Sequence, residues 1–301
     1  MLPNRVTIVD VGPRDGLQNE KQTVSTAHKV ELVHRLQAAG LREIEVTSFV
    51  SPKWVPQMAD NAKVMSGLRR QANVRYSVLV PNMKGLEAAL PTEPDEVVVF
   101  GAASEAFSQR NINCGIAESI ERFRPVVAAA HDSNLKVRGA ISCSLGCPYQ
   151  GAVSPDEVER VVMLMKGIGV DHCGVADTIG VGTPKRVQAA MERALKHYPV
   201  HEVSGHFHDT YGQALANIYA CLAMGIHTFD ASIAGLGGCP YAKGATGNVA
   251  TEDVIFMLKG LDIETGIDLG TLVDAGAFIS EVLGRPPVSR AGKALLAKRV
   301  A

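Results

Sequence analysis

The sequence lacks several patterns that would indicate a nucleic-acid-binding, membrane or secreted protein. Its 30 Lys and Arg residues are balanced by 31 Asp and Glu residues, and no basic run stands out, so we expect no nucleic-acid partner. The longest apolar run, residues 97–103, is far too short to cross a bilayer. The first residues show no signal-peptide pattern and the last ones no S-K-L-type signal. We therefore expect a cytoplasmic protein with no membrane partner.

The six cysteines form no C-x-x-C pair, which argues against a zinc-ribbon site. In a chain of 301 residues with 46% hydrophobic side chains, we expect these cysteines to be reduced thiols, most of them buried. A chain of this length can bury a large core without disulfides, either as two domains or as one α/β barrel of about 250 residues.

Short apolar, β-branched segments alternate with helical patterns along the chain. Eight segments are predicted strands: residues 5–10, 42–48, 74–81, 95–104, 135–144, 170–177, 201–209 and 226–235. The helical patterns occupy residues 25–40, 57–69, 82–90, 116–131, 154–169, 183–198, 212–225, 251–259 and 269–283. Ser25 or Thr26, Ser154 and Thr183 are predicted helix caps.

This alternation predicts an α/β fold, a TIM (β/α)₈ barrel with extra C-terminal helices. A doubly wound sheet is the competing architecture, but no G-x-G-x-x-G follows the first strand. No linker or low-complexity stretch divides the chain. We expect one catalytic domain, with a barrel over about residues 5–265 and a helical extension over about 266–301.

Chemically versatile side chains gather where the predicted strands end. The active site of a TIM barrel lies at the carboxyl ends of its strands. The polar residues there are Asp10, Arg14, Asp15, Glu45, Thr47, Ser48, Asp177, Thr178, His206, His208 and Asp209, and the loop after strand eight adds Cys239, Lys243 and Asn248. The amino ends of the predicted strands carry far fewer such side chains. The sequence therefore predicts a site at the rim formed by the carboxyl ends of the strands.

The segment "SGHFHDTYG" (204–212) holds two histidines at a spacing of two, so their side chains share one face of a strand. With Asp15 from strand one, His206 and His208 would form a facial set of two nitrogens and one oxygen, and Asn248 could add an amide oxygen. Mixed ligands of this kind suit Mg²⁺ or Mn²⁺ better than a structural zinc. The alternative is a pair of core histidines bonded to backbone carbonyls.

Three further rim residues carry reactive groups. Arg14 offers a planar fork for a carboxylate or an oxyanion, although its segment also suits a simple turn. Glu45 could face the barrel interior, as an orienting partner of Arg14, or face the helices. Cys239 lies among glycines in "GLGGCPYA", which favours a proton donor or nucleophile. Cys143 and Cys147 are interpreted as pocket lining.

Six motifs closely resemble the 3-hydroxy-3-methylglutaryl-CoA lyase family: "DVGPRDGLQNE", "TSFVSPKWVPQMAD", "FGAASEAFSQRNINC", "ADTIGVGTP", "HFHDTYGQALAN" and "GLGGCPYAKGATGNVATED". The resemblance runs from residue 6 to about 283, and the cysteine loop is its most specific part. It implies a metal-dependent TIM-barrel lyase. The implied reaction is a retro-Claisen cleavage of 3-hydroxy-3-methylglutaryl-CoA to acetyl-CoA and acetoacetate, in leucine degradation.

The resemblance also implies roles for individual residues. It implies four ligands for a divalent cation, Mg²⁺ or Mn²⁺: Asp15, His206, His208 and Asn248. The implied catalytic residues are Arg14, Cys239, Glu45, Asp177 and His206. Arg14 would stabilise the enolate, and Arg14 and Lys21 would bind the acyl-CoA. Asp15, Asp177 and His206 all stay open as the base that removes the hydroxyl proton.

Other functions remain compatible with these residues. A condensing enzyme of the isopropylmalate synthase type shares the Arg–Asp turn and the HxH strand, but usually has a larger C-terminal region and no such cysteine loop. A lyase acting on a close 3-hydroxyacyl-CoA analogue is a second alternative. A decayed, non-catalytic barrel is disfavoured by the intact set of site residues. We expect a small acyl-CoA substrate and a homo-oligomer, a dimer or higher.

Overall fold

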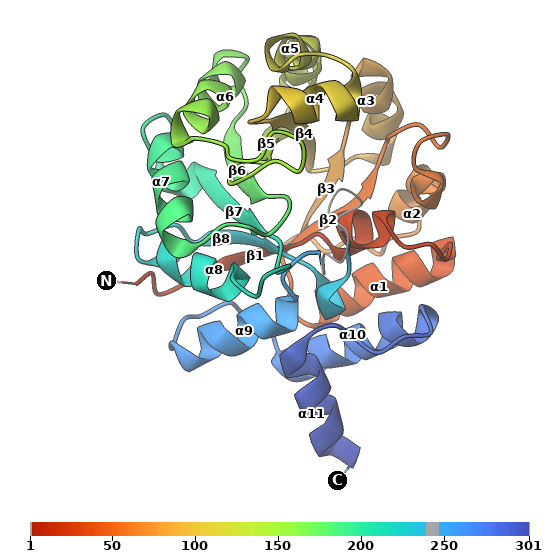
Figure 1. Cartoon of the computed structure of the whole chain (residues 1–301). Helices are drawn as coiled ribbons and strands as arrows, with labels where there is room; N and C mark the ends of the chain where they lie inside the picture. Colours follow the sequence, from red (N-terminus) through yellow and green to blue (C-terminus); the bar gives the residue numbers. More distant parts are fainter. Residues whose placement is uncertain (1, 239–246, 301) are drawn as a thin grey trace.

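Eight parallel strands pair in chain order, and the last pairs with the first, so that the sheet closes into a barrel (Figure 1). The computed structural model describes residues 2–238 and 247–300. Its strands are β1 (Thr7–Asp10), β2 (Glu43–Ser48), β3 (Arg75–Leu79), β4 (Glu96–Ala102), β5 (Lys136–Ser142), β6 (His172–Asp177), β7 (Val203–Phe207) and β8 (Thr228–Ala231). The predicted TIM barrel is confirmed.

Helices surround the barrel and cover its outer face (Figure 1). They are α1 (Thr26–Ala38), α2 (Asn61–Ser66), α3 (Met83–Ala89), α4 (Glu105–Ile112), α5 (Ile116–Asp132), α6 (Pro155–Gly167), α7 (Pro184–Leu195), α8 (Ala214–Leu222), α9 (Thr251–Gly260), α10 (Leu269–Val282) and α11 (Arg290–Val300). Short helical turns lie at η1 (Gly12–Gly16), η2 (Pro56–Met58), η3 (Leu90–Thr92), η4 (Val200–Glu202) and η5 (Ile233–Gly235). The predicted extra C-terminal helices are therefore present, while the division at about residue 265 stays a prediction.

Local sequence signals explain where two of the helices begin. The hydroxyl of Ser25 accepts the N–H of His28 at the start of α1. At the start of α6, Ser154 and Glu157 bond each other's backbone N–H groups in a capping box. Thr183 holds the N-cap position of α7, but its side chain makes no capping bond in the described chain.

Three segments differ from the sequence-based expectation. The helix predicted over 57–69 is divided into η2 and α2, with Asp60 between them in a non-helical conformation, where its carboxylate accepts a bond from Lys29 (2.6 Å). The short helix α4 was not predicted, although Ser104 caps it by accepting the N–H of Phe107. The helix α11 lies within the helical extension predicted over about residues 266–301, but no helical pattern was identified for residues 290–300 themselves. These differences concern helices outside the barrel and do not change the positions of the residues at the carboxyl ends of the strands.

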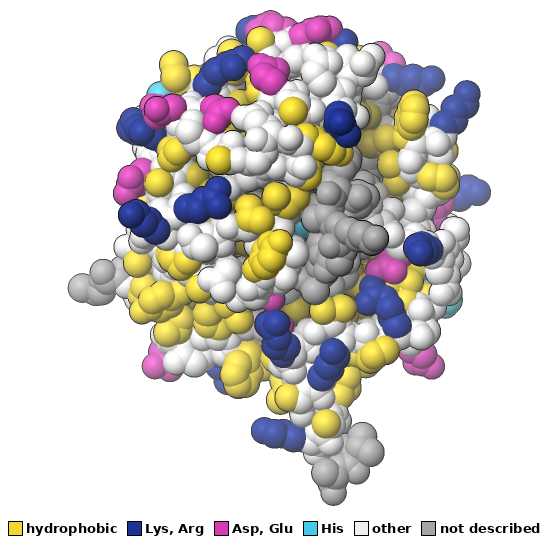
Figure 2. Space-filling model, in the orientation of Figure 1, with side chains coloured by type: hydrophobic (Ala, Val, Ile, Leu, Met, Phe, Trp, Pro, Cys, Tyr) yellow, Lys and Arg dark blue, Asp and Glu magenta, His cyan; other side chains and the backbone are white. Residues whose placement is uncertain are grey.

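On the face seen in Figure 2, Lys and Arg side chains are scattered among acidic and apolar ones. Within the described ranges, no helix combines the length and the apolar character needed to cross a bilayer.

Two buried carboxylates join the loop after β8 to β1 and α9. The Asp10 carboxylate accepts the N–H of Gly12 (2.9 Å) and the hydroxyl of Thr251 (2.7 Å). The Glu252 carboxylate accepts the N–H of Ala234 in η5 (3.0 Å). Burial raises the pKa of Asp10 to about 6 and that of Glu252 to about 8. The base of the β8 loop is therefore fixed by two carboxyl groups that lose their protons at a higher pH than exposed carboxyl groups do.

The raised pKa of Glu252 predicts a stability that falls with pH. The folded state binds this proton more tightly than the unfolded state, so the contribution is complete below about pH 4.5 and is lost as pH rises through about 8. Glu252→Gln mimics the protonated form and should flatten the profile. We expect wild type to lose about 2 kcal/mol relative to this variant between pH 5.5 and 7.5, measured by urea unfolding.

The matched control is Glu87→Gln, which changes an exposed glutamate of α3 and should follow wild type at each pH. If Glu252→Gln and wild type kept a constant difference in unfolding free energy from pH 5.5 to 7.5, the assigned proton would be wrong.

Candidate active site

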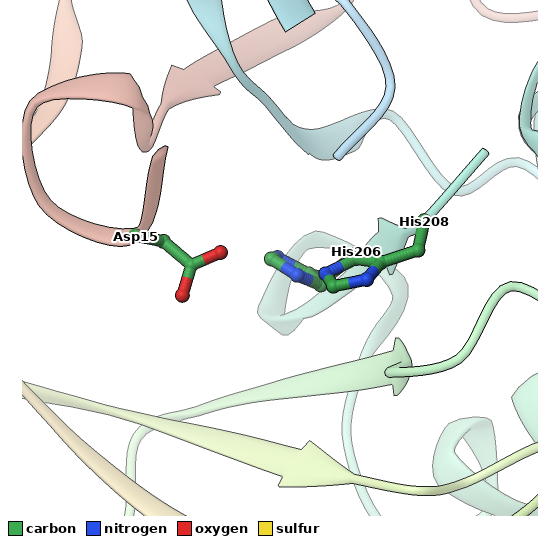
Figure 3. Close-up of side chains that lie close together, drawn as sticks. All are labelled: Asp15, His206 and His208. Carbon is green, nitrogen blue, oxygen red and sulfur yellow. The ribbon is translucent and has the colours of Figure 1, made fainter. Parts of the chain in front are cut away.

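Asp15, His206 and His208 converge at the carboxyl rim of the barrel. Asp15 belongs to η1 directly after β1, His206 lies in β7, and His208 follows the end of that strand. One ligand atom from each residue lies within 4.8 Å of the others. Figure 3 shows the carboxylate facing the two imidazoles, whose ring centroids are 5.3 Å apart. The spacing of two does place both histidines on one side.

The protonation states of Asp15 and His208 suit a cation. Burial alone would raise the pKa of Asp15, but Arg14 and the two histidines lower it to about 2, so the carboxylate is ionised. Burial and the neighbouring His206 lower the pKa of His208 to about 4, so this imidazole is neutral. Its Nδ1 is buried without a hydrogen-bond partner among the described residues. An ionised carboxylate and a neutral imidazole are the forms that bind a divalent ion.

His206 is oriented from below by Asp230 of β8. The Asp230 carboxylate lies 3.1 Å from Nδ1 of His206, which leaves Nε2 available as a ligand. Burial would lower the pKa of His206, but Asp230 more than offsets this effect and the pKa is raised. A carboxylate on the far nitrogen of an imidazole is a common support for a metal-binding histidine.

Asn248 lies beside the same cluster. It pairs with His208 in an isolated antiparallel bridge, and its side-chain Nδ2 donates to Oδ2 of Asp15 at 2.8 Å. The predicted fourth ligand is thus in contact with one of the other three.

Arg14 joins the cluster to the barrel interior. Its Nε donates to Glu45 at 2.6 Å and its Nη1 donates to Asp15 at 2.8 Å. Burial would lower the pKa of Arg14, but the two carboxylates outweigh burial and raise it. Glu45 is 1% exposed and faces the interior, which decides between the two orientations left open by the sequence.

The remaining predicted residues have different surroundings. Asp177 is fully buried, and its two oxygens accept the N–H groups of Val181 (3.1 Å) and Gly182 (2.8 Å), so it holds the loop before α7. Burial raises its pKa to about 6. Lys21 is exposed in the loop before α1. Cys239, like Lys243, lies outside the described residues.

The described residues on the two sides of the segment that carries Cys239, Gly237 and Gly247, lie next to each other. Gly247 has a φ of +83°, and a Cβ at this position would lie 2.6 Å from the carbonyl carbon of Gly237. Asn19 donates to the carbonyl of Gly238 at 3.0 Å, and the carbonyl of Gly247 accepts the N–H of Asp209 at 2.8 Å. Both ends of the segment are thus fixed beside the cluster.

Two contributors to the site were not predicted from the sequence. Asp230 contacts His206, and Arg138 of β5 donates to Asp230 at 2.8 Å. Each is a charged residue in the middle of a barrel strand, where burial of a charge is costly unless the charge is paired. That feature is the signal that could have identified them.

The fold and the rim residues define a (β/α)₈-barrel enzyme with a candidate centre for a divalent cation. A family model described as HMGL-like matches residues 5–279. The match spans most of the chain, and the protein belongs to this family.

Individual relatives agree over nearly the whole length. A protein of Pseudomonas aeruginosa named 3-hydroxy-3-isohexenylglutaryl-CoA/hydroxy-methylglutaryl-CoA lyase is 59% identical, with 99% of each chain covered. A crystal structure of hydroxymethylglutaryl-CoA lyase from the same species is 58% identical with a TM-score of 0.97, again over 99% of each chain. An Acinetobacter baumannii HMG-CoA lyase in complex with coenzyme A and 3-methylmalate is 33% identical, with a TM-score of 0.93 over 97% of this chain and 95% of that one.

The donor set predicts a metal affinity that depends on His208. After removal of bound metal by a chelator, calorimetric titration with Mn²⁺ should give one site per chain. His208→Ala should weaken binding by at least about 10-fold, because it removes one of three convergent ligand groups. His201→Ala, which changes an exposed histidine of η4, should leave the affinity unchanged. Equal affinities of His208→Ala and wild type would exclude this site.

Proposed function

We propose that the protein is a divalent-metal-dependent carbon–carbon lyase that cleaves 3-hydroxy-3-methylglutaryl-CoA to acetyl-CoA and acetoacetate. The observation that carries the proposal is the cluster of Asp15, His206 and His208 with Arg14 bonded to it, at the rim of a barrel of the HMGL-like family. The hydroxymethylglutaryl-CoA lyase structure that is 58% identical over 99% of both chains supports the substrate.

Asp15, His206, His208 and the amide oxygen of Asn248 would hold the cation, either Mg²⁺ or Mn²⁺. A bound divalent cation supplies Lewis-acid stabilisation of negative charge on a substrate oxygen. The protein's contribution is orientation: Asn248 holds Asp15, and Asp230 holds His206.

Arg14 is suited to stabilise the enolate that forms on the acetyl-CoA fragment. Its Nε and Nη1 are engaged by Glu45 and Asp15, while no described residue accepts a bond from Nη2. That nitrogen can therefore donate to a thioester oxyanion from a fixed position. Glu45 keeps the guanidinium in place and does not need to meet the substrate.

Proton transfer requires a base for the 3-hydroxyl group and an acid for the enolate carbon. Asp177 is the least suited of the three candidate bases, because it has no exposed surface and both its oxygens accept backbone bonds. We assign the acid to Cys239 from its loop motif, and the position of Gly238 and Gly247 beside the cluster supports this assignment.

The surroundings of the reaction are also part of the proposal. The substrate is an acyl-CoA, and the relative solved with coenzyme A supports this class; Lys21 would contact it.

The described cysteines are all free and buried, as expected in a reducing cytoplasm. We propose a homo-oligomer, because Tyr219 of α8 and Phe256 of α9 are exposed on neighbouring helices where Figure 2 shows apolar side chains gathered.

An assay for acetoacetate tests the proposal. Wild type should form acetoacetate from 3-hydroxy-3-methylglutaryl-CoA, lose this activity with a chelator and regain it with Mn²⁺ or Mg²⁺. Arg14→Lys keeps a charge but loses the fork, so kcat should fall by about 10²- to 10³-fold. Turnover that ignores the chelator would contradict the metal role. Release of free CoA from acetyl-CoA and a 2-oxo acid would instead indicate a condensing enzyme.

A second substrate is favoured by one comparison. The name of the 59% identical relative includes 3-hydroxy-3-isohexenylglutaryl-CoA, whose reacting carbons carry the same groups with a longer branch. We propose that this chain also cleaves such a branched analogue. The measurement is kcat/KM for both compounds, and absence of turnover with the longer one would restrict the protein to the methyl substrate.

A further inference from the structure

Arg138 occupies the barrel interior below the rim. It lies in β5 and is 5% exposed, and its guanidinium meets acids from three other strands. Nη1 lies 2.8 Å from Asp230 of β8, Nη2 lies 3.2 Å from Glu45 of β2, and Nε lies 3.7 Å from Glu96 of β4. A buried cation is costly unless it is paired in this way, and a buried ion pair is by itself weak evidence for a stabilising role. The position therefore calls for a role other than packing.

Two of these acids each divide their carboxylate between Arg138 and a residue of the site. Glu45 receives Arg138 on Oε2 and Arg14 on Oε1. Asp230 receives Arg138 on Oδ1 and contacts His206 through Oδ2. Arg138 thus lies one carboxylate away from both the enolate-binding arginine and a metal-binding histidine.

The contacts form a continuous series that closes at the rim. It runs from Arg138 through Glu45 to Arg14 in one direction, and through Asp230 to His206 in the other. Arg14 then bonds Asp15 (2.8 Å), which belongs to the same cluster as His206. We call Arg138, Glu45, Asp230, Arg14 and His206 the interior charge network.

We propose that Arg138 is a positioning residue that fixes the placement of Arg14 relative to His206, and so of the oxyanion donor relative to the metal. This inference rests on the proposed function for the roles of those two residues. The planar guanidinium suits the task, because its nitrogens hold two carboxylates at a set separation. A lysine ammonium would carry the same charge without fixing that separation.

The structure also provides a matched control. Glu96 is buried and lies on the third side of the same guanidinium, but its ion pairs are with Arg138 and Arg75 and not with Arg14 or His206. Replacing Glu96 perturbs the surroundings of Arg138 without interrupting the path to Arg14 or His206. If Arg138 only stabilised the fold, Arg138→Lys and Glu96→Gln would have similar effects on kcat and Mn²⁺ affinity, whereas the proposed role confines the losses to the Arg138 variant.

The experiment compares Arg138→Lys, Arg138→Gln and Glu96→Gln for kcat, KM, Mn²⁺ affinity and thermal unfolding. We expect both Arg138 variants to lower kcat by about 10- to 100-fold, to weaken Mn²⁺ binding by about 10-fold and to change KM by less than about threefold. Glu96→Gln should keep kcat and Mn²⁺ affinity within about twofold of wild type. If Arg138→Lys unfolded cooperatively and matched wild type in kcat and Mn²⁺ affinity, the proposal would be overturned.

A double-mutant cycle separates positioning from general stability. If Arg138 acts through Asp230, the loss of kcat in Arg138→Lys/Asp230→Asn is smaller than the product of the two single losses. If the loss of kcat in the double variant equals the product of the two single losses within twofold, the proposal is overturned. An Arg138→Lys variant that no longer unfolds cooperatively would also overturn it. Titration with Mn²⁺ needs no turnover. A wild type without lyase activity would therefore refute the proposed function while leaving the placement of His206 by Arg138 open to measurement.

Discussion

Charged side chains buried inside the barrel must be paired with opposite charges. The ion pairs of Arg138 with Glu45 and Asp230 fix the positions of the residues at the site. Arg138 gives the interior a fixed cation, and Glu45 of β2 and Asp230 of β8 contact it from the two strands that flank β1. Each acid then has one oxygen left to face the rim, where it holds Arg14 or His206. The reactive groups owe their positions to the rigid strands beneath them more than to the loops in which active sites usually vary.

The same arrangement sets the chemical state of each group at the rim. Asp15 is ionised because Arg14 and two imidazoles outweigh its burial, whereas His208 is neutral because burial and His206 oppose its charge. Asp177 and Glu252 are buried without a cation of this strength and have raised pKa values. Asp15, which Arg14 contacts directly, is therefore in the form that a cation requires, whereas Asp177 and Glu252 accept backbone N–H groups and have a structural role.

The sequence was informative where one element alone determines the outcome. The barrel followed from eight apolar strands alternating with helices, and the face shared by His206 and His208 followed from the period of a strand. Contacts across the barrel could not be derived in this way. Arg138 and Asp230 are 92 positions apart, and nothing in either strand reveals the other until the sheet has closed. The short helix α4 was missed because its eight residues offer little periodicity.

The close approach of Gly237 and Gly247 gives the rim a further property. Because the chain departs and comes back through one narrow neck, fixed by Asn19 on one side and Asp209 on the other, the residues between can vary in number without shifting the strands that carry the ligands. The entropy of closing a loop changes only slowly with loop length, so a longer or shorter segment would alter stability little. The rim therefore holds the two ends of this segment together at one point beside the candidate cation site, independently of the residues between them.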